Sequence, residues 1–158
     1  MQYNAISNGG DTPGQWRVLT QEEMSYILGR EDIAYSFAKV FVNGVRGLLL
    51  FPDDFECPSQ LTPPNGLNDR TFAFNNDEIS HLDNSWQSLE SAGAVFLPQT
   101  GQRNSTAFSN ETQGLYWLSN YSSNNRASYF SIKLADITCN TTTARHYGYA
   151  VRLVHDVE

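Results

Sequence analysis

The dipeptide Asn43-Gly44 lies between two runs of β-branched and apolar residues, 40–42 and 45–51. Asn and Gly readily adopt the positive φ angles of a two-residue type I′ turn, which connects neighbouring antiparallel strands. The flanking runs have the composition of strands. The sequence therefore predicts a β-hairpin over residues 40–51 that turns at Asn43-Gly44, and this is the sharpest local signal in the chain.

Two other segments have the apolar periodicity of amphipathic helices. The first begins at Thr20, which has the capping-box spacing to Glu23, and Gly29 is its predicted C-cap. The second ends before Gly93, its predicted C′ residue. The apolar positions are Met24, Ile27 and Leu28 in the first helix and Ile79, Leu82, Trp86 and Leu89 in the second.

Short strands are predicted in much of the remaining chain, at 16–19, 94–97, 116–118, 127–134 and 147–154. Alternation along the last two strands predicts which side chains share a face. In 127–134 these are Phe130, Ile132 and Leu134 toward the core and Tyr129, Ser131 and Lys133 outward; in 147–154 they are Tyr149, Val151 and Leu153.

The segments between these elements are rich in turn-forming and polar residues. Residues 55–78 predict a long surface excursion, and 119–125 and 138–143 predict polar loops. Two helices followed by several antiparallel strands and long irregular loops define the α+β class.

Composition fits one domain and excludes several kinds of partner. A chain of 158 residues with 40% hydrophobic and 17% charged residues is typical of a single folded domain. Its net charge of −7 argues against nucleic acid as a partner. The apolar run 48–51 is far too short to span a membrane, and the first residues lack the features of a signal peptide.

Signatures of catalysis and metal binding are missing from the sequence. There is no G-x-S-x-G, G-x-G-x-x-G, P-loop or H-E-x-x-H motif. Asp53, Asp54 and Glu56 lack the glycine-kinked loop of a calcium site and predict a solvated turn. Cys57 and Cys139 do not form a zinc motif, which leaves two free thiols or a disulfide. We therefore expect no catalytic residue, no metal and no cofactor.

The C-terminal third combines Asn, Ser and Thr with tyrosines, the composition that antibody paratopes use for recognition. Its cations give local positive charge in an acidic protein, which favours an anionic or polar partner. The alternative is that the aromatic residues belong to the core and the polar residues to solvated loops. The candidate ligand-binding residues are Asn120, Tyr121, Asn124, Asn125, Arg126, Asn140, Arg145, His146 and Tyr147.

The three tryptophans and two of the arginines are expected to be structural. Trp16, Trp86 and Trp117 each lie beside apolar strand or helix positions. Arg17 and Arg152 lie within the apolar strand motifs WRVL and AVRLV, where a guanidinium needs carboxylate or carbonyl partners.

Six motifs resemble those of a known family in their order and spacing: YNAISNGG, GQWRVLTQEEMSYIL, AKVFVNGVRGLLLFPD, ESAGAVFLPQTGQR, GLYWLSNYSSNNRASYFSIKL and YGYAVRLVHD. Over residues 3–157 the chain resembles the major paralogous domain family of Bacteroidetes and Fibrobacter succinogenes. The resemblance implies a single domain with a C-type-lectin-like fold. It also implies a relationship to the formylglycine-generating enzymes and to the variable proteins of diversity-generating retroelements.

The chain departs from the family pattern at several positions. Met24 stands where the family usually has Trp, and Leu118 where it usually has Ser. The sugar-binding calcium motifs EPN, QPD and WND are absent, so calcium-dependent sugar binding is not implied. The catalytic cysteine pair of the formylglycine-generating enzymes is not reproduced, because Cys139 has no nearby cysteine in the sequence.

The resemblance implies a non-enzymatic module that binds a protein or glycan ligand on the surface of a bacterial cell or phage. Its expected location is therefore extracellular or on the cell surface. A retroelement-diversified variable protein is one form that such a module takes. The alternatives are a structural or assembly module of a larger surface protein, with no ligand of its own, and an enzyme of the formylglycine-generating type.

Overall fold

The computed structural model describes residues 16–30 and 32–155. Within them the chain forms a mixed α+β fold, and no helix there is long and apolar enough to cross a membrane. The helices are α1 (Gln21–Gly29) and α2 (Trp86–Ser91). The strands are β1 (Trp16–Val18), β2 (Phe37–Val42), β3 (Val45–Leu50), β4 (Ser80–His81), β5 (Val95–Pro98), β6 (Gln102–Asn104), β7 (Ala107–Ser109), β8 (Gly114–Ser123), β9 (Arg126–Lys133), β10 (Asp136–Ala144) and β11 (Leu153–His155).

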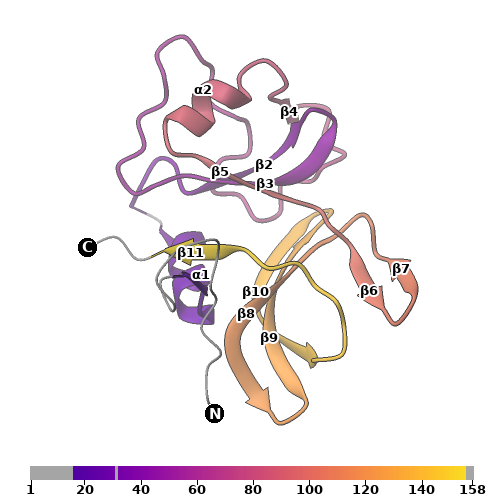
Figure 1. Ribbon diagram of the computed structural model, residues 1–158. Coiled ribbons are helices and arrows are strands. Elements are labelled where there is room, and N and C mark those ends of the chain that lie inside the picture. Colours follow the sequence, from indigo (N-terminus) through magenta and orange to yellow (C-terminus); the bar gives the residue numbers. More distant parts are fainter. Residues whose placement is uncertain (1–15, 31, 156–158) are drawn as a thin grey trace.

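A four-stranded sheet in the order β4-β2-β3-β5 forms the upper half of the molecule in Figure 1. Its centre is the predicted hairpin, in which Val42 pairs with Val45. Asn43 and Gly44 have φ angles of 50° and 75°, as a type I′ turn requires. The hairpin prediction is therefore confirmed, and the ladder extends further back, to the start of β2.

Helix α1 begins as predicted. The Thr20 hydroxyl accepts a hydrogen bond from the Glu23 amide at 3.1 Å, and the Glu23 carboxylate accepts one from the Thr20 amide at 2.8 Å. The Arg17 guanidinium donates two further bonds to this carboxylate, at 2.8 and 2.7 Å. These bonds lower the pKa of Glu23 below its usual range and confirm the structural role predicted for Arg17.

The predicted C-cap of this helix is wrong by one residue. Gly29 is the last helical residue, and the C-cap is Arg30 with an extended backbone. The buried Arg30 side chain donates to the Phe51 carbonyl at 2.9 Å and pairs with Asp53. Because these contacts direct the chain away from the helix, the left-handed glycine conformation is not needed here.

The second helix is shorter than predicted, since α2 begins only at Trp86. Ile79 and Leu82 precede it, and between them β4 runs parallel to β2. The Leu82 amide donates to the Phe41 carbonyl at 2.8 Å, so this apolar residue is buried through a strand contact and not through a helical face. Gly93 has φ +93°, which confirms it as the C′ residue.

The antiparallel sheet β10-β9-β8 forms the lower half of Figure 1. The loops predicted at 119–125 and 138–143 are wrong, because most of their residues belong to β8 and β10. Their Thr, Tyr and Ser side chains are compatible with strands that are exposed on one face. Ser131 alternates with Phe130 and Ile132 as predicted, but it is fully buried on its own face, where its hydroxyl forms a hydrogen bond with that of Thr138 at 2.7 Å. Leu134 contradicts its predicted core position, because it lies beyond the end of β9 and is 46% exposed.

The prediction of a strand over 147–154 is also wrong, since only β11, which begins at Leu153, pairs as a strand in this segment. Its partner is β1, so the two ends of the described chain pair as antiparallel strands. Residues 148–150 instead form isolated bridges to Arg103 of β6 and Tyr116 of β8. Val151 therefore has no strand neighbour to pack against and is 51% exposed.

The four-stranded sheet is covered on both faces. One core lies between this sheet, α1 and the lower sheet, and it contains Phe37, Leu48, Leu97, Tyr116 and Phe130. The other lies beneath α2 and contains Ala38, Val40, Leu49, Leu82 and Leu89. Successive residues of β2 and β3 alternate between the two cores, as strand geometry requires.

Residues 55–78 contain no helix or strand, as predicted. This excursion is nevertheless anchored, because Phe55 and Phe74 are buried in the two cores. The Asn68 side-chain carbonyl accepts a hydrogen bond from the Ser36 amide at 2.8 Å. The segment therefore folds against the edge of β2 instead of extending into solvent.

We expect Gly47→Ala to lower the free energy of unfolding by about 2–3 kcal/mol. A Cβ at Gly47 would lie 2.4 Å from the Phe96 ring and 2.5 Å from the Leu97 carbonyl, which belongs to the β3–β5 ladder. The matched control is Gly29→Ala, where the space is open and Ala favours the helix by about 1 kcal/mol. Urea denaturation measures both variants, and equal stabilities would contradict the packing at β3.

A second prediction concerns Lys39, which is fully buried in β2 and donates to the Arg70 carbonyl at 2.6 Å. Burial lowers its pKa from 10.5 to about 8. Between these values the unfolded chain binds more protons than the native protein, so the free energy of unfolding rises with pH. Lys39→Met lacks this titration. We therefore expect the free energy of unfolding of the native sequence, relative to that of this variant, to increase as the pH rises through that window. Urea denaturation at several pH values measures both proteins. A difference that does not change with pH would exclude a desolvated amine at Lys39.

Candidate functional site

Four aromatic side chains meet on the side of the lower sheet that faces away from the core, and we call them the aromatic face. They are Trp117 of β8, Tyr129 of β9, and Tyr147 and Tyr149 of the segment before β11. Trp117 and Tyr149 stack with their ring centroids 4.6 Å apart. The Tyr129 ring meets the Tyr149 ring edge-on with a centroid distance of 5.2 Å, and the Tyr147 ring stacks on the Tyr149 ring with a centroid distance of 6.0 Å. All four side chains are partly exposed.

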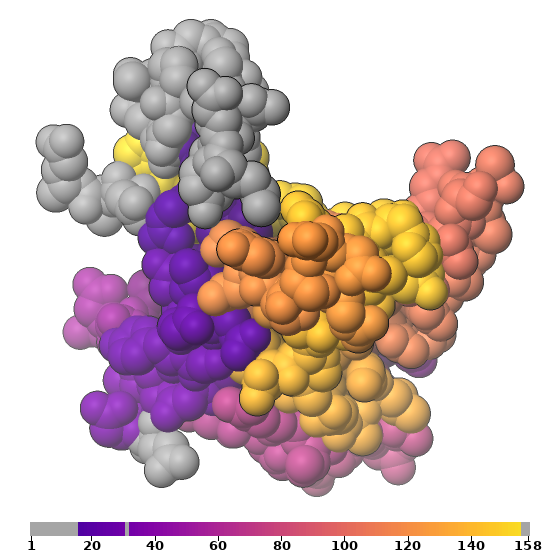
Figure 2. All heavy atoms as spheres, turned by 90° about the horizontal axis from the view of Figure 1, so that it is seen from below, coloured from indigo at the N-terminus to yellow at the C-terminus, as the bar shows by residue number. Residues whose placement is uncertain are grey.

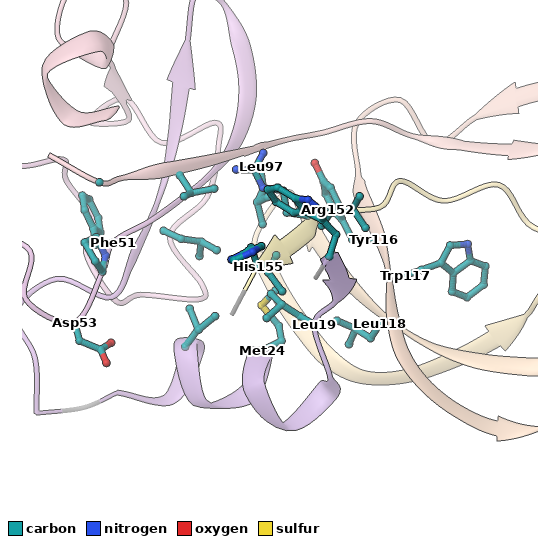
Figure 3. A pocket seen from close by; sticks show the side chains of 18 of the residues that line it. Leu19, Met24, Phe51, Asp53, Leu97, Tyr116, Trp117, Leu118, Arg152 and His155 are labelled. Atoms are coloured by element: carbon teal, nitrogen blue, oxygen red, sulfur yellow. The ribbon is translucent and has the colours of Figure 1, made fainter. Parts of the chain in front are cut away.

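Strand alternation places the first two members of this face. Tyr116 and Leu118 are buried in the core, so Trp117 between them points to the other side of β8, as Figure 3 shows. Tyr129 is the direct cross-strand partner of Trp117 and therefore lies on the same side. Two adjacent strands thus supply a rigid base.

Backbone hydrogen bonds to two different strands place Tyr149 over this base. The Gly148 amide donates to the Arg103 carbonyl at 2.7 Å, and the Arg103 amide donates to the Gly148 carbonyl at 2.9 Å. On the other side of Tyr149, Ala150 is bonded to β8 through both its amide and its carbonyl, each at 2.9 Å. The ring is therefore fixed by its flanking backbone and is not carried on a free loop.

The electrostatics of this region favour hydrogen bonding to a polar or anionic group. Burial raises the pKa of Tyr149, while a hydrogen bond to Thr143 opposes the shift, so the hydroxyl is protonated at neutral pH. Residues 114–155 contain four Lys and Arg side chains and a single carboxylate, Asp136, although the whole chain has a net charge of −7. This part of the molecule is therefore locally positive.

The tip of the β8–β9 hairpin brings four of the predicted site residues together. Asn124 and Asn125 form its turn, and the Arg145 amide donates to the Asn125 carbonyl at 2.9 Å. Arg145 also reaches the Asn124 carbonyl at 3.5 Å through its guanidinium. Arg126 donates to the Thr142 carbonyl at 2.6 Å. In Figure 2 the orange and yellow atoms of this sheet lie together on the face seen from below.

Three other predicted residues lie beside the aromatic face or belong to it. Tyr121 pairs with Ala127, two residues before Tyr129, and therefore lies on the same side of the sheet. Its side chain is 61% exposed. His146 is exposed, and its ring centroid lies 4.4 Å from that of Tyr147. Tyr121, His146 and Tyr147 are thus accessible from one side.

Arg126 does not share this side, contrary to the expectation that it clusters with Tyr121. It precedes Ala127 on β9, so alternation directs it to the opposite face, where it bonds to Thr142. The bulges that shift the β8–β9 register near the tip could not be read from the sequence.

Asn120 and Asn140 contact helix α1 instead of the aromatic face. The Asn120 side-chain carbonyl accepts a hydrogen bond from the Gln21 amide at 2.6 Å, and its amide donates to Glu22 at 3.0 Å. The Asn140 side-chain carbonyl accepts a hydrogen bond from the Gln21 side-chain amide at 3.2 Å. These contacts join the first turn of α1 to the lower sheet, which is a structural role.

The tryptophans have structural contacts, but Trp117 also belongs to the site. Trp16 meets His155 edge-on at 5.3 Å, and Trp86 packs against Phe96 at 5.8 Å. All three tryptophans are only partly buried. Trp117, Tyr129 and Tyr149 are not among the site residues predicted from the sequence. For Trp117 and Tyr129 the available signal was their position between buried neighbours in a strand, whereas the sequence around Tyr149 contains no such signal.

Contacts of the described residues bear on the cysteines and on Arg152. Cys57 and Cys139 are both free, and Cys139 lies 3.1 Å from the Ser25 hydroxyl, so the two thiols do not form a disulfide. Within residues 16–30 and 32–155, no group of three His, Cys, Asp or Glu side chains is arranged to hold a metal. Of the two arginines predicted to be structural, Arg17 has a carboxylate partner, whereas Arg152 is exposed.

Comparisons with known proteins give no relative for this chain: no family model, no curated protein and no solved structure matches it.

We expect alanine substitution of a stacked ring and of an exposed ring at this site to have different effects on the stability of the protein. Trp117→Ala removes a ring that stacks on Tyr149 and should lower the free energy of unfolding by about 3 kcal/mol. Tyr121→Ala removes a ring that is 61% exposed and should change it by less than about 0.5 kcal/mol. Urea denaturation of both variants checks this, and a loss of several kcal/mol at Tyr121 would place that ring in the scaffold.

Proposed function

We propose that the protein is a non-enzymatic ligand-binding module with a C-type-lectin-like fold, presented on the surface of a bacterial cell or phage. Its ligand is a protein or a glycan, and no catalytic residue or cofactor takes part. The observation that carries this proposal is the aromatic face, in which Trp117, Tyr147 and Tyr149 stack while remaining partly exposed. The family resemblance supports the fold and the location.

The physical argument rests on preorganisation. Tyrosine and tryptophan offer large contact areas at low entropic cost, and they dominate the energetics of many interfaces. Here their rings are held by each other and by the hydrogen bonds of residues 148–150, so little order is lost on binding. Tyr121 and His146 extend the accessible surface on the same side.

Of the two ligand classes, the ring geometry favours a protein. Neighbouring rings are inclined by only 26° between Trp117 and Tyr149 and by 15° between Tyr147 and Tyr149. Stacked rings cover each other's faces, so their edges and hydroxyl groups are what a ligand can reach. A sugar that packs on a ring face needs an uncovered ring, which on this side is the exposed Tyr121, whereas a polypeptide can also use the hydroxyls and edges of the stacked rings.

A structural or assembly module is the second candidate, and specific contacts favour it. Asn120 and Asn140 bond to α1, and Arg126 bonds to Thr142, so three of the predicted ligand contacts serve the fold. A module of this kind would have no ligand for the aromatic face.

Alanine at Tyr121 or Tyr147 should weaken binding at least about tenfold while the domain stays folded, because single aromatic anchors often contribute that much. The matched control is Tyr26→Ala, since Tyr26 of α1 is also 61% exposed. Protein and glycan arrays identify the ligand, and surface plasmon resonance then compares the variants.

The arrays and the variants separate the two candidates. If Tyr26→Ala weakens binding as much as Tyr121→Ala does, the aromatic face is not the ligand surface. The absence of any bound protein or glycan would favour the assembly module.

A further inference from the structure

A cavity of about 480 Å³ opens between α1, the β1–β11 pair and the four-stranded sheet (Figure 3). Its volume lies within the range of about 300–1,000 Å³ that is typical of small-molecule sites. Most of its wall is apolar, and side chains from both halves of the molecule contribute. These include Met24, Ile27, Leu50, Val95, Leu97 and Leu118.

Of the two arginines around this cavity, one has a carboxylate partner among the described residues and the other does not. At one margin Arg30 is neutralised by Asp53 and also donates to the Phe51 carbonyl at 2.9 Å. Arg152 and His155 lie nearer the centre in Figure 3, away from Asp53. Among the residues that the structure describes, Arg152 is not joined to any carboxylate by a salt bridge, and it is exposed. The cavity thus presents one unneutralised guanidinium beside apolar walls.

We propose that this cavity binds a small apolar monocarboxylate, with the hydrocarbon chain against the apolar wall and the carboxylate at Arg152. A guanidinium binds a carboxylate through two parallel charge-assisted hydrogen bonds, and it stays charged at every physiological pH. The hydrocarbon chain gains by leaving water for walls contributed by buried side chains such as Met24, Leu97 and Leu118. A ligand with only one of these two parts would leave the other half of the site unused.

This site is independent of the proposed ligand surface. Tyr116, Trp117 and Leu118 of β8 all border the cavity, but the Trp117 ring points away from the side chains of Tyr116 and Leu118 (Figure 3). The two sites therefore lie on opposite sides of one strand. Failure of either proposal leaves the other intact, because the probes and the substituted residues differ.

The test uses three soluble probes on the whole chain: octanoate, 1-octanol and acetate. Isothermal titration calorimetry should detect octanoate binding, much weaker octanol binding and no acetate binding. Arg152→Gln should weaken octanoate binding at least about tenfold, as expected for the loss of a bidentate charged pair. Arg103→Gln is the matched control, since Arg103 is also exposed but does not line the cavity, and it should bind octanoate like the native sequence.

Methyl NMR of the native sequence provides a readout that does not depend on any variant. Octanoate should shift the methyl signals of Ile27, Leu50 and Leu118, which line the cavity, and leave those of Val42 and Leu89 in the other core unchanged. The proposal is overturned if octanoate does not bind, if Arg152→Gln binds it as well as Arg103→Gln does, or if the shifts occur in the other core. Equal binding of octanoate and octanol would also overturn the assignment of the carboxylate to Arg152.

Discussion

The register of the β2–β3 hairpin is the constraint on which the rest of the structure depends. Val42 pairs with Val45 across the turn, and this pairing sends Phe37 and Leu48 into one core and Ala38 and Leu49 into the other. A shift of one residue would exchange the two faces of a strand that is buried on both sides. The positive φ angles at the Asn-Gly turn therefore determine how both halves of the molecule pack.

The lower sheet depends on that arrangement through α1 and the chain ends. Helix α1 covers the core side of the sheet, and its first turn is bonded to Asn120 of β8. The pairing of β1 with β11 returns the end of the chain to the same helix. Residues 148–150 are consequently drawn across β8, which is what places Tyr149 on Trp117. The candidate site is thus a product of tertiary pairing and not of a local motif.

This dependence explains what the sequence could predict. Thr20 and Glu23 form a capping box whose partners are three residues apart, and the Asn43-Gly44 turn is equally local, so both were predictable. Ile79 and Leu82 fitted a helix but are buried by β4 and its contact with β2, a partner far away in the chain. Composition predicted Tyr121 as a site residue, whereas the position of Tyr149 depends on bridges to two strands that are far away in the sequence. Polar residues in 119–123 suggested a loop, because a ladder with one exposed face has no distinctive apolar signal.

Neighbouring residues of β8 serve different roles, which connects the fold to the proposed ligand binding. Tyr116 and Leu118 hold the strand in the core, and Trp117 between them is thereby fixed as the base of the aromatic face. Binding surfaces that rest on a rigid scaffold tolerate substitutions at their outer positions, because those positions contribute little to stability. Tyr121 and His146 are exposed and extend this surface, whereas Trp117 and Tyr149 are half-buried and stacked. In the proposed binding module, substitution at the exposed pair would therefore change the partner, while loss of the stacked pair would remove the base that presents the surface.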